Sequence, residues 1–175
     1  MTTRSLEERL RDVEDRLEIL NLIAAHPPGA DTGADTYIRT AWTEDGVLDL
    51  GSDKTMNGRD TIASHVRIPG HQAAIEFGIC HFAGLPHIAL NGDTAVVTSY
   101  LQILVPQDQG EPVDVPNHGV SKGFRIHRAG ANRWDLVRTK DGWKIKHRVS
   151  APMNTKKARQ ILRQGLEHAT GGKTG

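Results

Sequence analysis

The hydrophobic periodicity of this chain changes near residue 79, and this change constrains the fold more than any other feature. Before it, apolar residues recur at steps of three and four, as on one face of a helix. After it, β-branched residues alternate with polar ones, as in strands that bury one face. Helices followed by a run of strands predict an α+β fold, with the helices packed on one face of a curved antiparallel or mixed sheet. A pocket between the two layers would hold a small molecule.

The first expected helix covers residues 5–25. Ser5 and Glu8 form a capping-box pattern at its start, and Pro27-Pro28-Gly29 ends it because proline cannot donate the next helical hydrogen bond. Its apolar residues draw a single stripe: Leu6, Leu10, Val13, Leu17, Leu20 and Ala24. We expect this stripe to pack inside the molecule; a partner helix is the alternative.

Further helices are expected over residues 33–43, 58–66 and 71–77, with a short strand over 46–50 between the first two. The strands of the second half are expected over residues 79–82, 87–90, 95–105, 120–128, 133–139 and 143–150. Residues 106–117 contain three prolines and are expected to form a loop.

Length and composition predict one domain over residues 1–170, ending in a helix over about 154–169, with a flexible tail at 171–175. A net charge of +1 gives no basic footprint for nucleic acid, and no apolar run is long enough for a membrane span. The charged N-terminus does not look like a targeting peptide, and Cys80 is the single cysteine. We therefore expect a cytoplasmic protein that binds neither nucleic acid nor membrane.

Histidine is unusually frequent, with nine residues against eight Phe, Trp and Tyr residues. It is the commonest general base near neutral pH, so its positions carry the functional argument. No histidine spacing resembles H-E-x-x-H or a Cys/His cluster, and no G-x-G-x-x-G follows a strand. The sequence therefore predicts neither a metal site nor a cofactor.

Several passages, in this order, resemble the SnoaL-like branch of the cone-shaped α+β superfamily, which includes nuclear transport factor 2, ketosteroid isomerase and scytalone dehydratase. The resemblance covers about residues 5–150. Its landmarks are Asp31, Trp42-Thr43-Glu44-Asp45-Gly46-Val47-Leu48, Gly58-Arg59-Asp60-Thr61-Ile62, Cys80-His81-Phe82, Asn91-Gly92-Asp93-Thr94-Ala95-Val96, and Asp141-Gly142-Trp143-Lys144-Ile145 with Arg148. The resemblance implies a cone-shaped α+β barrel that encloses a pocket.

The pattern is most similar to that of scytalone dehydratase, bile acid 7α-dehydratase and hexachlorocyclohexane dehydrochlorinase. That resemblance implies that Asp31 and His81 form a catalytic dyad, with His26 where some of these enzymes have Tyr or Lys. It also implies a cationic residue around His147 or Arg148, and strand alternation favours His147 because it would share a face with Trp143 and Ile145. Further candidates for substrate contact, besides these two, are Tyr100, Trp42 and Phe82.

These residues also have ordinary structural interpretations. Asp31 could cap a turn, His81 could be a satisfied core histidine, and His26 could complete the end of a helix. Trp42 could be a core residue, and Tyr100 and His147 could be pocket walls or structural bonds.

The functional hypothesis is a cofactor-independent lyase of the dehydratase type, acting on a small apolar cyclic or aromatic substrate. His81 would remove a carbon-bound proton, and Asp31 would fix its tautomer. One alternative is an isomerase or retro-aldol lyase that uses the same base, and another is a non-catalytic binding or assembly subunit. We expect a homo-oligomer, a dimer or a trimer.

Overall fold

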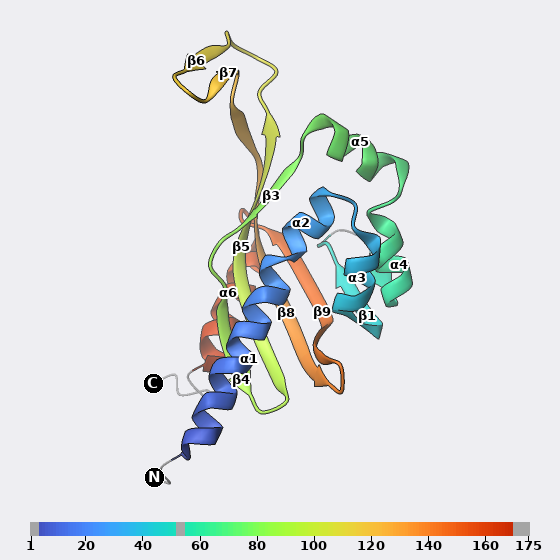
Figure 1. The fold of residues 1–175 in the computed structure, drawn as a ribbon, viewed down its shortest axis with the longest axis vertical. Coiled ribbons are helices and arrows are strands. Elements are labelled where there is room, and N and C mark those ends of the chain that lie inside the picture. The colour runs from blue at the N-terminus through green and yellow to red at the C-terminus, as the bar shows by residue number, and fades with distance from the viewer. Residues whose placement is uncertain (1–3, 52–54, 170–175) are drawn as a thin grey trace.

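The structure is a computed structural model that describes residues 4–51 and 55–169 (Figure 1). Its helices are α1 (Leu6–Ala24), α2 (His26–Asp31), α3 (Asp35–Ala41), α4 (Arg59–His65), α5 (Pro69–Phe77) and α6 (Lys156–Ala169). Its strands are β1 (Trp42–Asp49), β2 (Thr55–Asn57), β3 (Cys80–Ala83), β4 (His87–Asn91), β5 (Thr94–Pro106), β6 (Val113–Val115), β7 (Gly119–Ser121), β8 (Phe124–Thr139) and β9 (Gly142–Pro152). The predicted tail at residues 171–175 lies outside the described part.

The main sheet has the strand order β2-β1-β9-β8-β5-β3, and β4 also pairs with β5. All neighbouring strands are antiparallel except β1 and β9, which run parallel. The sheet is therefore mixed. Helices α1, α3 and α4 cover one of its faces, and α6 packs against β8, β4 and β5 (Figure 1). The predicted α+β class and the curved mixed sheet are confirmed.

Two hydrophobic clusters hold these layers together. The larger one joins Ile19 and Ile23 of α1 to sheet residues that include Trp134, Leu136 and Ile145. The smaller one joins Ala158 and Ile161 of α6 to the sheet at Ala131 and Ala151. Ala131 and Trp134 lie three residues apart in β8, so their side chains point to opposite faces of the sheet. The sheet is therefore covered on both sides, and the helix expected over 154–169 is confirmed as α6.

The start and end of α1 follow the sequence signals. Ser5 Oγ accepts from the backbone N–H of Glu8 at 3.1 Å, and the Glu8 carboxylate accepts from the backbone N–H of Ser5 at 2.7 Å. The helix ends at Ala24, before the two prolines. These prolines then occupy the first turn of α2, where a missing N–H costs nothing. The segment after the break is therefore a helical turn that ends on Asp31.

The prediction that the apolar stripe of α1 packs inside the molecule is wrong. The residues of α1 that are buried are Asp15, Ile19 and Ile23. Leu6, Leu10, Val13 and Leu17 are 77%, 55%, 52% and 56% exposed. The stripe lies on the outer face because Asp15 anchors the opposite face to the sheet. Its carboxylate accepts from the Arg138 guanidinium and, at 3.1 Å, from Trp143 Nε1.

The expected strands at 120–128 and 133–139 form a different arrangement. Residues 124–139 make one continuous strand, β8, which pairs with β5 over residues 124–137 and with β9 over residues 130–139. Val120 lies instead in β7, which pairs with β6 in a two-stranded hairpin. This hairpin projects from one end of the molecule (Figure 1) and occupies part of the segment predicted as a loop.

No helix in the described ranges is both long enough and apolar enough to cross a membrane.

Candidate functional site

A cavity of about 220 Å³ lies between the helices and the sheet. Its apolar wall comes from α3, α4, β1 and β5: Ile38, Ile62, Val66, Leu48, Leu101 and Ile103. Its polar groups are His26, His65, His71, His81, Arg128, Arg148 and Ser150. The cavity thus combines an apolar wall with several titratable side chains.

Asp31 and His81 meet at the wall of this cavity. Asp31 is the last residue of α2, and His81 is the second residue of β3. Asp31 Oδ1 lies 2.5 Å from His81 Nδ1, and Asp31 Oδ2 accepts from the His81 backbone N–H at 2.8 Å. The side chains are 19% and 16% exposed. Two hydrogen bonds to one carboxylate hold both the ring and its strand, so a proton on Nδ1 leaves Nε2 as the free acceptor.

His26 and Arg148 form a second polar pair at the cavity. Arg148 Nη1 donates to His26 Nε2 at 2.6 Å, and Nη2 donates to Asn132 Oδ1 at 3.1 Å. A guanidinium has no acceptor, so His26 Nε2 must accept, and the imidazole is neutral with its proton on Nδ1. Trp134 supports both groups: its ring lies 4.3 Å from Arg148 Cζ and 4.9 Å from the His26 ring.

The electrostatics of this pair agree with its geometry. Burial lowers the pKa of His26 well below its ordinary value, and the nearby charge of Arg148 lowers it further. Burial also lowers the pKa of Arg148 to about 9, with Arg128 as the second cause. Near neutral pH the pair is therefore a neutral imidazole beside a guanidinium cation. Because the partners of Arg148 are neutral acceptors, its charge remains available to an anionic or developing-anion group of a ligand.

The structure places Arg148, not His147, at the cavity. The β8–β9 pairing shifts register between Asp135 and Leu136, so β9 contains a bulge before His147. A bulge inserts one residue and reverses the alternation after it. His147 therefore lies on the face opposite to that of Trp143 and Ile145. Its Nδ1 is 3.5 Å from Asp135 Oδ2, and it faces a hollow beside α6. The alternation argument for His147 is wrong for this reason.

Three further candidates lie away from the cavity. Tyr100 and Phe82 are 57% and 59% exposed, and the cavity contacts their strands through Leu101 and His81 instead. Adjacent residues of a strand face opposite sides of the sheet, so Tyr100 points away from the cavity beside Leu101, and Phe82 points away beside His81. Trp42 is 1% exposed and belongs to the larger hydrophobic cluster, as the structural interpretation of this residue expected.

His65 and His71 also line the cavity, and the centres of their rings lie 5.9 Å apart. His71 Nε2 lies 2.9 Å from the carbonyl oxygen of Ala30, next to Asp31. Arg128 and Ser150 also line the cavity and were not among the candidates from the sequence. Arg128 lies in β8. Its cross-strand partner is Ile103, and the pairing shifts register beside it, so its face could not be read from alternation.

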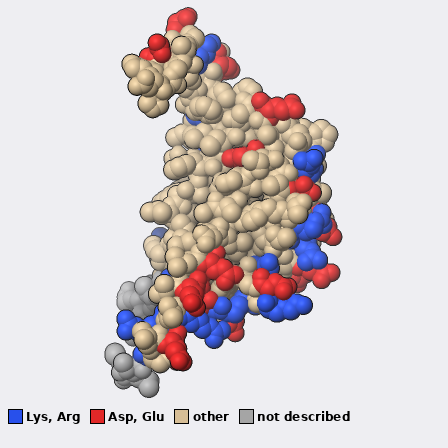
Figure 2. Space-filling view, viewed as in Figure 1, with Lys and Arg blue, Asp and Glu red and all other residues tan. Residues whose placement is uncertain are grey.

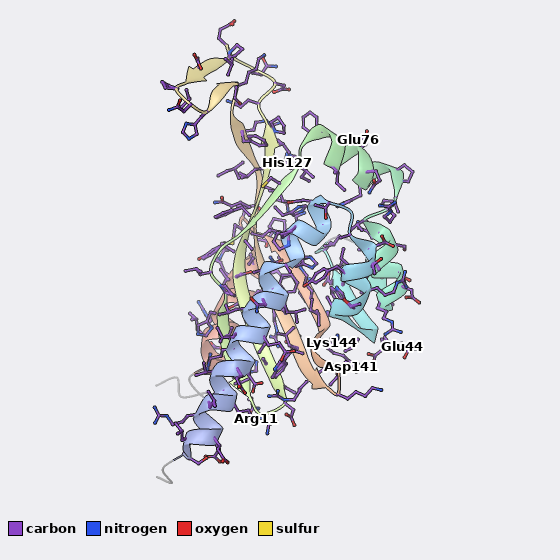
Figure 3. The ribbon with its side chains drawn as sticks, in the orientation of Figure 1. Arg11, Glu44, Glu76, His127, Asp141 and Lys144 are labelled. Carbon is purple, nitrogen blue, oxygen red and sulfur yellow. The ribbon has the colours of Figure 1, made fainter. Side chains whose placement is uncertain are left out.

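The other histidines lie elsewhere. His127 is exposed on the upper part of β8, near the projecting hairpin (Figure 3). Within the part of the chain that the structure describes, no three His, Cys, Asp or Glu side chains converge as ligands for a metal ion.

Comparison with known proteins places this fold and cavity in a family. The sequence model of the SnoaL-like domain matches residues 11–149. A crystal structure of an NTF2-like protein with a cystatin-like fold from Novosphingobium aromaticivorans has 34% identity and a TM-score of 0.78, covering 90% of this chain and 94% of that one. A search of the curated proteins finds no match.

More distant structures share the fold alone. A candidate scytalone dehydratase from Novosphingobium aromaticivorans has 15% identity and a TM-score of 0.62, covering 85% of this chain and 89% of that one. A candidate dehydratase of the NTF2-like family from Streptomyces avermitilis has 17% identity and a TM-score of 0.58, covering 81% of this chain and 98% of that one. The family match and the structure of 34% identity are the stronger findings: this chain belongs to the family of SnoaL-like domains, with the NTF2-like, cystatin-like fold.

Proposed function

We propose that this protein is a cofactor-independent lyase that catalyses a dehydratase-type elimination on a small cyclic or aromatic substrate. The contact between Asp31 and His81 carries the proposal, because it places an oriented imidazole at the wall of a largely apolar cavity. Dehydratases occur among the structural neighbours, but their names describe those proteins.

In the proposed reaction, His81 Nε2 removes a proton from a carbon atom next to a carbonyl group. The Asp31 carboxylate stabilises the imidazolium that forms. The electrons of the broken C–H bond form the carbon–carbon double bond as the bond from the neighbouring carbon to its hydroxyl group breaks. That hydroxyl group takes the proton from His81 Nε2 and leaves as water, which returns His81 to its neutral form. A positioned general base contributes about 10²–10⁴-fold to such a reaction.

Arg148 and His26 suit the stabilising role in this reaction. The Arg148 guanidinium is a cation that donates hydrogen bonds, and it lines the same cavity as His81. A fixed donor aimed at developing negative charge on a carbonyl or leaving oxygen lowers the barrier more in a dry cavity than in water. His26 Nε2 accepts a hydrogen bond from Nη1 of the guanidinium, so His26 acts here as a positioning residue.

The test is product analysis with a panel of cyclic β-hydroxy ketones. The wild-type protein should release water, which mass spectrometry detects as a loss of mass, and Asp31→Asn should be slower by about 10²–10⁴-fold. An unchanged mass with a shifted double bond would indicate an isomerase that uses the same base. Release of an aldehyde would indicate retro-aldol cleavage. Ligand binding with no turnover in any assay would favour a binding subunit.

The cytoplasmic location and the absence of a cofactor remain predictions from the sequence.

A further inference from the structure

The outer face of α1 carries a row of apolar side chains that the domain leaves uncovered. Leu6, Leu10, Val13 and Leu17 are each more than half exposed, whereas the buried residues of this helix are Asp15, Ile19 and Ile23. At about 100° per residue, the centre of the row lies roughly 150° from the centre of the buried face. The row therefore points almost directly away from the molecule.

The spacing of this row is that of a coiled-coil seam. Leu10 and Leu17 are seven residues apart and take the a positions, while Leu6 and Val13 take the d positions. In this register Asp15 falls at f and Ile19 at c, which are outer positions of a coiled coil. Together with Ile23, which lies beyond the seam at a g position, these are the residues that α1 buries against its own domain. A second helix on the seam would therefore leave the packing of both domains intact.

The charges beside the seam distinguish the two possible directions of a partner helix. Arg9 at g and Glu14 at e are both exposed. In a parallel pair, g of one helix faces e of the next heptad on its partner, so Arg9 would meet Glu14 of the second copy twice by symmetry. In an antiparallel pair, g faces g and e faces e, which brings like charges together. Arg16, the next g residue, already donates to the carbonyl oxygen of Ile88 on its own domain.

The surrounding charge disfavours a lipid surface as the occupant. Residues 4–18 contain four arginines against six aspartates and glutamates, and both signs gather at this end of the molecule (Figure 2). A helix that binds anionic lipid needs a basic polar face instead. A second copy of α1 supplies both the apolar row and the matching charges.

We propose that α1 of this protein pairs in parallel with α1 of a second copy, through Leu6, Leu10, Val13 and Leu17. The pair lies on the side of α1 that faces away from the cavity. It makes a two-fold dimer in which each domain keeps its own Asp31–His81 site. This proposal does not depend on the proposed activity.

Disulfide trapping in the full chain tests the pairing. In a Cys80→Ser background, Val13→Cys places a thiol at a d position, where parallel helices bring equivalent residues together. Arg11→Cys, at an exposed b position outside the seam, is the matched control. On mild oxidation, Val13→Cys should form a covalent dimer at least about tenfold faster than the control. Equal rates, or a monomer at all concentrations in sedimentation, would overturn the proposal.

Charge reversal tests the direction. Arg9→Glu should raise the dimer dissociation constant several-fold, because the introduced carboxylate would then face Glu14 of the partner subunit. The double variant Arg9→Glu/Glu14→Arg should restore dimerisation. Tighter dimerisation of the single variant would indicate an antiparallel pair and contradict the proposal. Circular dichroism checks that each variant keeps its helix content.

Discussion

At the scale of single residues, the candidate site consists of two polar pairs in which the imidazole has different partners. His81 has a carboxylate partner, whereas His26 has a cationic one. The imidazole of His81 is therefore oriented by a carboxylate, whereas that of His26 is kept neutral by burial and by the guanidinium. Such a difference between neighbouring titratable groups is typical of sites that divide acid–base and binding roles.

The neutrality of His26 predicts a pH dependence of stability. The pKa of His26 is lowered in the folded protein by burial and by Arg148, whereas in the unfolded chain it is about 6.5. Below that pH the unfolded state binds a proton that the folded state excludes, so stability falls by up to about 1.4 kcal/mol per pH unit. Urea unfolding at about pH 7.5 and about pH 5.5 measures this loss.

The matched variants for this prediction are His26→Gln and His118→Gln. His26→Gln should lose that part of the pH dependence, whereas His118→Gln, which changes an exposed histidine beside the β6–β7 hairpin, should keep the wild-type dependence. Equal pH dependence in His26→Gln and wild type would show that His26 is protonated in the folded state.

The sequence predicted Asp31 and His81 as a pair, and the structure brings them together. The cationic side chain at the cavity is that of Arg148, and His147 lies elsewhere. Asp31 and His81 lie on opposite sides of a contact between α2 and β3, which local sequence does not encode; the family resemblance supplied it. The exchange of His147 for Arg148 depends on one extra residue in β9, and such a bulge has no sequence signal here.

At the scale of elements, α1 shows how a distant partner overrides local periodicity. Its stripe indicated the wrong inner face, because Asp15 bonds to Arg138 and Trp143, more than a hundred residues away in the chain. The ion pair with Arg138 holds the pKa of Asp15 below its usual range. The helix limits depend on neighbouring residues, such as the Ser5–Glu8 cap and the proline pair, and these were predicted correctly.

Removal of the Asp15 carboxylate should therefore destabilise the fold strongly. Asp15→Ala leaves the Arg138 guanidinium and the Trp143 N–H without this acceptor, and such a loss costs about 3 kcal/mol. Asp12→Ala on the same helix removes an exposed ion pair with Arg4 and should leave the free energy of unfolding nearly unchanged. Chemical denaturation measures both variants, and similar losses would contradict the anchoring role of Asp15.

At the scale of the whole molecule, the order of helices and strands predicted the α+β class, and the pairing of β1 with β9 completes the sheet. This parallel contact joins strands about a hundred residues apart, so no turn signal could indicate it. It brings Leu48 beside Arg148, and both line the cavity. The site is therefore a product of long-range topology, with α2 and β3 supplying Asp31 and His81.

We propose that His81, oriented by Asp31, is the base of an elimination in this cavity. The direct measurement compares kcat/KM of His81→Ala and His147→Ala on a cyclic β-hydroxy ketone that the wild type dehydrates. We predict a loss of about 10²–10⁴-fold for His81→Ala, and a value close to wild type for His147→Ala, which lies on the other side of the sheet. Wild-type activity in His81→Ala, or an equal loss in both variants, would contradict the claim.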